Sequence, residues 1–130
     1  MGKELKIGIV DDNTAFRESL RFFIETILHH QIISETRNGK EFLTTALNPT
    51  PDILLMDIEM PILNGLEIAK LLIHQNYPAQ IIAISNHSER IITERLKSIG
   101  FKGIINKNNI YAELPRAINR VILNQLYFPE

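Results

Sequence analysis

Three aspartates stand at the ends of apolar segments, where their carboxylates could share one cation. Asp11 and Asp12 follow the apolar segment 5–10, and Asp57 closes a near-continuous apolar run that starts at residue 51. Carboxylates that lie close together repel, so one must take up a proton or a cation must neutralise them. Mg²⁺ suits this need, because it binds through a few carboxylates, waters and phosphate oxygens rather than a complete protein cage.

Two more polar residues end later apolar runs. Ser85 closes the run 80–85 and offers a hydroxyl, and Lys107 follows the run 103–106 and offers a mobile ammonium. Together with an acid pair and a carboxylate nucleophile, they suit in-line phosphoryl transfer, in which catalysis is positioning and charge neutralisation. Each residue alone has a simpler explanation, such as a helix cap or a solvated strand end. The hypothesis therefore rests on five residues at the ends of four strands.

The elements that must position these residues alternate along the chain. Short apolar or β-rich runs predict strands at residues 5–10, 31–34, 51–58, 80–85 and 103–106. Apolar residues at spacings of three and four predict helices over residues 16–27, 42–47, 66–73, 91–99 and 114–125. Asn13 or Thr14 is the expected cap of the first helix, and Gly100 is placed to end the fourth. Pro115 belongs in a first helical turn, so we expect the last helix to start near residue 112 or 113.

This alternation predicts an α/β fold, (βα)5, with a doubly wound parallel five-stranded sheet covered by helices on both faces. The crossovers should be right-handed. The expected strand order is 2-1-3-4-5, the flavodoxin-like order, with the site at the carboxyl ends of the strands where the order reverses. In that order, the strands that end at Asp11 and at Asp57 are neighbours.

Composition narrows the class of protein. The chain has 130 residues, enough for one domain, with 45% hydrophobic and 22% charged residues. It has no cysteine, which excludes thiol catalysis, disulfides and thiolate metal sites. The net charge of -1 gives no basic surface for nucleic acid, so we expect no specific DNA binding by this chain alone. No membrane span or signal peptide is evident, and we expect a cytoplasmic protein.

The chain resembles the receiver domains of bacterial two-component response regulators over essentially its whole length. The resemblance rests on segments 9–13 (Ile-Val-Asp-Asp-Asn), 54–61 (Leu-Leu-Met-Asp-Ile-Glu-Met-Pro), 64–65 (Asn-Gly) and 84–85 (Ile-Ser), and on Lys107. Segment 113–118, with Tyr127 and Phe128, resembles the last receiver helix and linker of LuxR/NarL-type regulators. This predicts a receiver domain over residues 1–126, with 127–130 starting a linker to a helix-turn-helix output domain absent from this chain.

The resemblance implies a role for each site residue. Asp57 would accept the phosphoryl group, Asp12 would bind Mg²⁺ directly, and Asp11 would bind it mainly through water. The backbone carbonyl of Glu59 would be a further Mg²⁺ ligand. Lys107 would pair with the phosphoryl oxygens. Ser85 would hydrogen-bond the phosphoryl group and pull its loop inward.

The resemblance also implies partners. A sensor histidine kinase would supply the phosphoryl group, a homodimer is allowed, and DNA would be reached only through the absent output domain. Such a domain is not an enzyme beyond self-phosphoryl transfer and autodephosphorylation. Its output would be control of transcription.

Three positions depart from the family pattern. Ile104 stands where a Tyr or Phe usually reorients when the Ser or Thr moves. Asn108 follows Lys107 where many receivers have Pro, and Asn86 follows Ser85 where a small residue is usual. These departures leave phosphorylation intact and predict a weaker output switch.

His87 lies two residues past Ser85, as Glu59 lies two residues past Asp57, so the pair could control water access to an acyl phosphate. The simpler interpretation of His87 is a residue near the start of the fourth helix.

Three other functions are compatible with some of these sequence features. A flavodoxin-like electron carrier needs a hydroxyl- and Gly-rich loop after the first strand, and Asp11 and Asp12 would repel its flavin phosphate. A Mg²⁺-dependent aspartyl phosphatase needs a second acid two residues after its nucleophile, where Glu59 has the wrong length, and usually a cap domain. A pseudo-receiver that binds proteins without responding to phosphorylation is favoured by Ile104 and opposed by the intact set of five site residues.

Overall fold

Five parallel strands and five α-helices alternate along the chain in the computed structural model, which describes residues 3–59, 65–86 and 90–128. The strands are β1 (Lys6–Val10), β2 (Gln31–Thr36), β3 (Ile53–Asp57), β4 (Gln80–Ser85) and β5 (Gly103–Asn106). The α-helices are α1 (Thr14–Phe22), α2 (Gly39–Thr45), α3 (Gly65–His74), α4 (Arg90–Ile99) and α5 (Ile110–Val121). A π-helical turn, η1 (Phe23–Ile27), continues α1, and a 3-10 turn, η2 (Lys107–Asn109), leads into α5. No helix in the described part of the chain is long and apolar enough to span a membrane.

The strands form one parallel sheet in the order β2-β1-β3-β4-β5. The predicted (βα)5 alternation and strand order are therefore confirmed. Asp57 pairs in register with Ile84, and Ser85 pairs with Asn106. This register brings Asp57, Ser85 and the following Lys107 to the same edge of the sheet.

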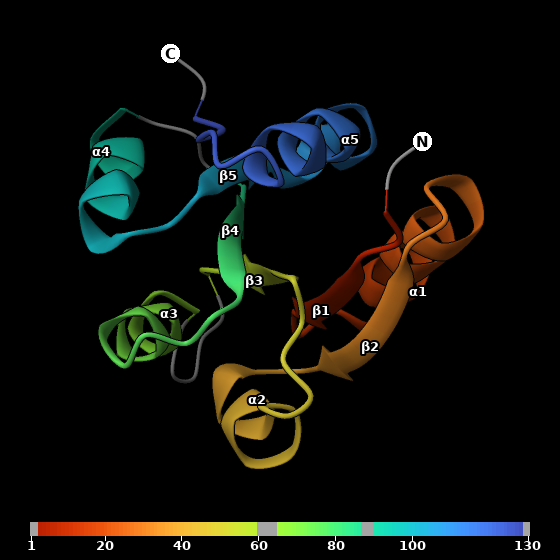
Figure 1. Cartoon of the computed structure of the whole chain (residues 1–130), viewed down its shortest axis with the longest axis horizontal. Helices are drawn as coiled ribbons and strands as arrows, with labels where there is room; N and C mark the ends of the chain where they lie inside the picture. Colours follow the sequence, from red (N-terminus) through yellow and green to blue (C-terminus); the bar gives the residue numbers. More distant parts are fainter. Residues whose placement is uncertain (1–2, 60–64, 87–89, 129–130) are drawn as a thin grey trace.

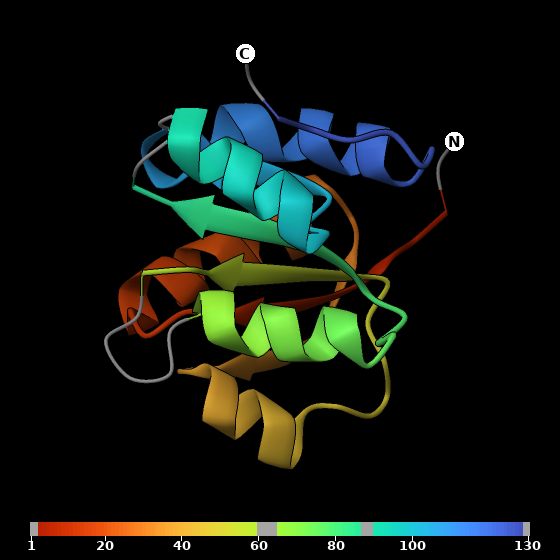
Figure 2. The ribbon, with the colours of Figure 1, turned by 90° about the vertical axis from the view of Figure 1, so that its left-hand side faces the viewer.

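Helices cover both faces of the sheet, with α1 and α5 on one face and α2, α3 and α4 on the other (Figure 1; Figure 2). Alternate residues of each strand supply the two cores. In β3, Ile53 and Leu55 belong to the core under α1 and α5, whereas Leu54 and Met56 belong to the other. Burial on both faces explains why β3 is an unbroken apolar run up to its terminal aspartate.

Core packing sets the limits of the last helix. The predicted start near residue 112 or 113 is wrong, because α5 begins at Ile110, which is buried four residues before Leu114. Pro115 therefore lies inside the helix rather than in its first turn, and Gln125 lies beyond its end. The apolar stripe of Ile110, Leu114 and Ala117 packs on the sheet and outweighs the preference of proline for a helix start.

Side-chain caps and strand pairing determine where α1, α2 and β2 begin or end. Asn13 caps α1 by accepting a hydrogen bond from the Phe16 amide at 2.9 Å. Of the two predicted caps, Asn13 and Thr14, Asn13 is therefore the one observed. Residues 39–45 form α2 instead of the predicted 42–47, because the Asn38 side chain caps it by accepting from the Glu41 amide at 2.8 Å. The second strand runs to Thr36, two residues past its predicted end, because its pairing with β1 continues.

The chain after α5 returns to the free edge of β5. The Tyr127 amide donates to the carbonyl of Lys102 at 2.9 Å, and the Ile104 amide donates to the carbonyl of Tyr127 at 3.0 Å. The Tyr127 hydroxyl lies 3.2 Å from Glu113 Oε1, to which it donates. Tyr127, in the segment predicted to begin a linker, thus lies against the sheet edge.

Candidate functional site

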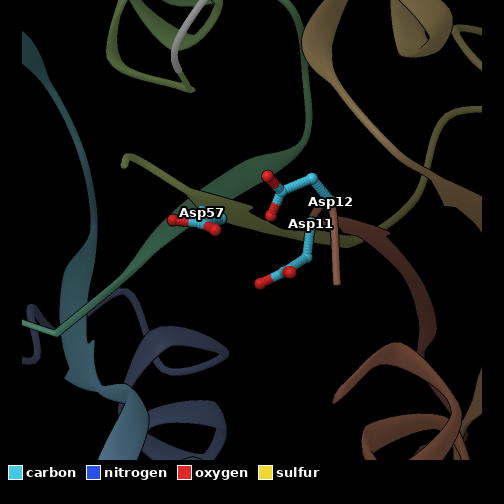
Figure 3. A group of neighbouring side chains, drawn as sticks. All are labelled: Asp11, Asp12 and Asp57. Atoms are coloured by element: carbon cyan, nitrogen blue, oxygen red, sulfur yellow. The ribbon is translucent and has the colours of Figure 1, made fainter. Parts of the chain in front are cut away.

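The three predicted aspartates meet at the carboxyl edge of the sheet. Asp11 and Asp12 follow β1, Asp57 ends β3, and one carboxylate oxygen from each lies within 4.8 Å of the others. Figure 3 shows the three side chains pointing toward a shared space. Asp11 and Asp57 are buried, whereas Asp12 is exposed. The structure therefore joins two buried acids and one acid that solvent or a ligand can reach.

Lys107 joins this cluster from the end of β5. Its ammonium lies 2.7 Å from Asp11 Oδ2 and 3.4 Å from Asp57 Oδ2. It also lies 4.5 Å from the centre of the Phe16 ring, which shields one side of the charge. Burial lowers the pKa of Lys107, but pairing with Asp11 and Asp57 outweighs this and raises the pKa above its ordinary value. The two carboxylates therefore stabilise the charged form of Lys107.

Asp57 is held in an environment that disfavours its charge. Burial and the nearby Asp11 raise the pKa of Asp57 from 3.8 to about 6, although the Glu59 amide and Lys107 oppose the rise. The Glu59 amide donates to Asp57 Oδ1 at 2.8 Å, while Oδ2 faces Lys107. The carboxylate is thus oriented from both sides, and a further cation would favour its ionised form.

The loop after β1 is both a helix cap and part of the acidic site. Asp11 Oδ1 accepts a hydrogen bond from the Asn13 amide at 2.8 Å, and Asn13 caps α1. Arg17, which is buried, donates to the carbonyl of Asp11 at 2.5 Å and lies 3.5 Å from Glu35. Asn13 takes the capping role, so the two preceding aspartates serve the cluster.

The side chain of Glu59 makes two contacts that the sequence did not predict. Its Oε2 accepts a hydrogen bond from Ser85 Oγ at 3.0 Å, and its Oε1 accepts from the Asn86 amide at 2.9 Å. Ser85 is fully buried. The sequence signal is an acid two residues after the central aspartate, but its spacing along the chain does not predict which partners its carboxylate has.

Part of the family sequence pattern lies outside the described residues, namely Met60, Pro61 and Asn64. His87, which was predicted to control water access, also lies outside them. Gly65 is described and begins α3. A Cβ atom at Gly65 would overlap the carbonyl oxygen of Asp57 and lie 2.7 Å from Met56 Cγ. This glycine lets α3 approach the end of β3 closely, a role beyond the turn that Asn-Gly indicates.

Two of the departures from the family pattern have local explanations. The Asn108 amide donates to Asn106 Oδ1 at 2.9 Å and so caps the turn η2, a bond that proline could not make. Asn86 meets Glu59 through its backbone amide, so its side chain is not needed for the contact. Ile104 is 1% exposed and packs in the core under α2, α3 and α4.

A family model for the response regulator receiver domain matches residues 7–119. This chain belongs to that family. The predicted resemblance is confirmed, and this receiver domain is the signal-receiving part of a two-component response regulator.

Known relatives of the receiver domain are longer proteins. Response regulator GacA of Pseudomonas syringae pv. syringae is 28% identical over 123 residues, covering 95% of this chain and 58% of GacA. Transcriptional regulatory protein YdfI of Bacillus subtilis is 37% identical over 103 residues, covering 79% of this chain and 48% of YdfI. This chain therefore spans about half of the length of these relatives.

The fold of this receiver domain is also similar to that of a solved LuxR-family regulator. The crystal structure of a two-component response regulator from Aurantimonas sp. SI85-9A1 matches with a TM-score of 0.87 at 25% identity. The match covers 96% of this chain and 89% of that one. The LuxR/NarL-type resemblance predicted from segment 113–118 is supported by this match.

Receiver domains are mainly signalling domains and bind Mg²⁺ through an acidic pocket, and this receiver has such a cluster in Asp11, Asp12 and Asp57. The donor set fits the ion, because carboxylate oxygens converge and the exposed Asp12 leaves one side open to water. The family match argues against the electron-carrier and phosphatase alternatives.

Proposed function

We propose that this receiver domain accepts a phosphoryl group on Asp57 from a sensor histidine kinase in a Mg²⁺-dependent reaction. The observation that carries the proposal is the convergence of three carboxylates within 4.8 Å, with the Lys107 ammonium between Asp11 and Asp57. Asp11, Asp12, Asp57 and the Glu59 backbone carbonyl would hold the ion. When bound, Mg²⁺ supplies the positive charge that lets an anionic donor approach an acidic site.

In the transfer, an oxygen of the Asp57 carboxylate attacks phosphorus and forms an O–P bond. The P–N bond of the donor phosphohistidine breaks, and the leaving imidazole keeps the electron pair and takes up a proton. The Glu59 amide and Lys107 hold the carboxylate from opposite sides, so the attacking group is oriented before the donor arrives. This domain would catalyse only its own phosphorylation and dephosphorylation.

After transfer, Lys107 and Ser85 would bind the new phosphoryl oxygens and bias the domain toward its active conformation. Transcription control is the proposed output, because GacA and YdfI are named as a response regulator and a transcriptional regulatory protein. DNA would be reached through an output domain joined to the receiver, and a homodimer is a compatible partner state.

Incubation with acetyl phosphate or phosphoramidate, followed by intact-mass measurement, tests the proposal. We expect a phosphoryl mass increment with Mg²⁺, none with excess chelator, and none in Asp57→Asn. Asp52→Asn is the matched control, because it makes the same chemical change at the opposite end of β3 and keeps an acceptor for the Lys6 amide. A domain that gains no phosphoryl group from these donors or from a kinase would instead be a pseudo-receiver, and an increment surviving in Asp57→Asn would assign another acceptor.

A further inference from the structure

The side chain of Glu59 links the ends of two strands at the site. It leaves the chain two residues after Asp57 on β3 and contacts both Ser85, at the end of β4, and the adjacent Asn86 amide. Both contacts are hydrogen bonds to a carboxylate, at 3.0 and 2.9 Å. Meanwhile the Glu59 backbone amide donates to Asp57 Oδ1 at 2.8 Å. One residue therefore contacts the phosphoacceptor through its backbone and the neighbouring strand end through its side chain.

These contacts matter because phosphoryl oxygens and carboxylate oxygens are acceptors of the same kind. The Ser85 hydroxyl has one proton to donate, and in this structure it donates that proton to Glu59. A phosphoryl group on Asp57 that binds Ser85 must take this donor from Glu59. The new group would also place a charge of about -2 beside an acidic side chain, which opposes the existing arrangement.

We propose that Glu59 is a positioning residue that restrains the switch, holding Ser85 and Asn86 in the resting arrangement until the phosphoryl group displaces its carboxylate. The inference rests on the proposed phosphorylation of Asp57. Phosphorylation then acts by exchange, because Ser85 passes from one anionic acceptor to another. The restraint sets how strongly the resting state is preferred, so weakening it makes the active arrangement easier to reach.

Two variants change the side-chain contacts of Glu59 and keep the hydrogen bond of its backbone amide. Glu59→Gln keeps the length and removes the charge, and Glu59→Ala removes both acceptors while leaving the backbone amide for Asp57. Glu4→Gln makes the same charge change before β1, at the opposite end of the sheet from the site, and serves as the control.

The first measurement is the amide NMR spectrum of the unphosphorylated domain. We expect the Asn86 and Ser85 amide signals to move in Glu59→Ala and to stay in place in Glu4→Gln. Unmoved Asn86 and Ser85 signals in Glu59→Ala would overturn the restraint directly, whether or not the domain is phosphorylated.

The second measurement is the affinity for beryllofluoride, an acyl-phosphate mimic, with Mg²⁺ present. We expect Glu59→Gln to bind about threefold to tenfold more tightly than the unaltered domain, because the restraint on Ser85 is weaker. A general charge effect would give the same gain without Ser85. The affinities of proteins with Glu59 and with Glu59→Gln are therefore also compared in a Ser85→Ala background. We expect the gain to be much smaller there, because only the charge repulsion between Glu59 and the mimic remains.

A gain of the same size in Ser85→Ala, or no gain in the unaltered background, would overturn the exchange. Failure of the proposed function gives a different result. In that case the unaltered domain would take up neither beryllofluoride nor a phosphoryl group, and the exchange would also be wrong.

Discussion

Lys107 makes its shortest ion pair with Asp11, with 2.7 Å between Nζ and Oδ2. The distance from the same ammonium to Asp57 is longer, at 3.4 Å. The lysine that the family pattern assigns to the phosphoryl group therefore pairs with the buried Asp11 of the acidic cluster in the resting domain. Phosphoryl transfer to Asp57 would give Lys107 a stronger anionic partner at the end of β3.

Lys107→Ala is expected to separate phosphorylation from the conformational change. Asp57 keeps its Mg²⁺-dependent reactivity, but the new phosphoryl oxygens lack the cation that couples them to β5. Intact mass should show a phosphoryl increment, while the amide NMR changes seen on phosphorylation of the unaltered domain should largely disappear. Lys70→Ala, at an exposed position on α3, is the control. A full set of changes in phosphorylated Lys107→Ala would contradict the coupling.

Stability without Mg²⁺ should depend on pH through Asp57. Its folded-state pKa of about 6 exceeds the ordinary value of 3.8, so the folded state binds this proton more tightly than the unfolded state. The free energy of unfolding should therefore fall as pH rises from about 4 to about 6, by on the order of 1–3 kcal/mol.

Urea denaturation in chelator measures this effect. Asp57→Asn should lack it, so its advantage over the unaltered domain should grow across that pH range and then level off. Adding Mg²⁺ at neutral pH should raise the free energy of unfolding of the unaltered domain, because the ion binds the folded acidic cluster. A constant difference between the two proteins across this range would show that Asp57 does not carry the pH dependence.

Gly65→Ala is expected to destabilise the domain. Glycine to alanine at a compatible helix position usually stabilises, by about 0.4–1 kcal/mol. Here a new Cβ would overlap the Asp57 carbonyl oxygen, so α3 must move away from the end of β3. We expect a loss of about 1–3 kcal/mol by urea denaturation, with Lys70→Ala close to the unaltered domain. A Gly65→Ala domain as stable as that control would show that the contact relaxes without cost.

Ile104 should limit how far phosphorylation spreads into α4. It is buried in the core and has no ring to reorient or hydroxyl to re-bond. Beryllofluoride should therefore change the amide signals of residues 90–101 less in the unaltered domain than in Ile104→Tyr. A pocket of about 520 Å³, lined in part by Ile104, Asn106 and Tyr127, adjoins the position. Large changes through residues 90–101 in the unaltered domain would refute this.

The sequence by itself determined the fold class, the strand order and the residues of the acidic edge. Strand ends were readable because apolar runs stop abruptly at polar residues such as Asp11, Asp57 and Lys107. Parallel strands direct all their carboxyl ends to one edge, so the topology alone predicts which of these residues meet. The same local patterns misplaced the start of the last helix, because packing of Ile110 on the sheet overrode the preference of Pro115.

Only the tertiary structure decided which side chains pair at that edge. Glu59 and Ser85 are 26 residues apart along the chain, and they meet because β3 and β4 pair with Asp57 beside Ile84. Lys107 had two acids within reach, and its shorter distance to Asp11 depends on the exact positions of three strand ends. Such pairings depend on register and side-chain conformation in three dimensions, and no spacing of residues along the chain encodes them.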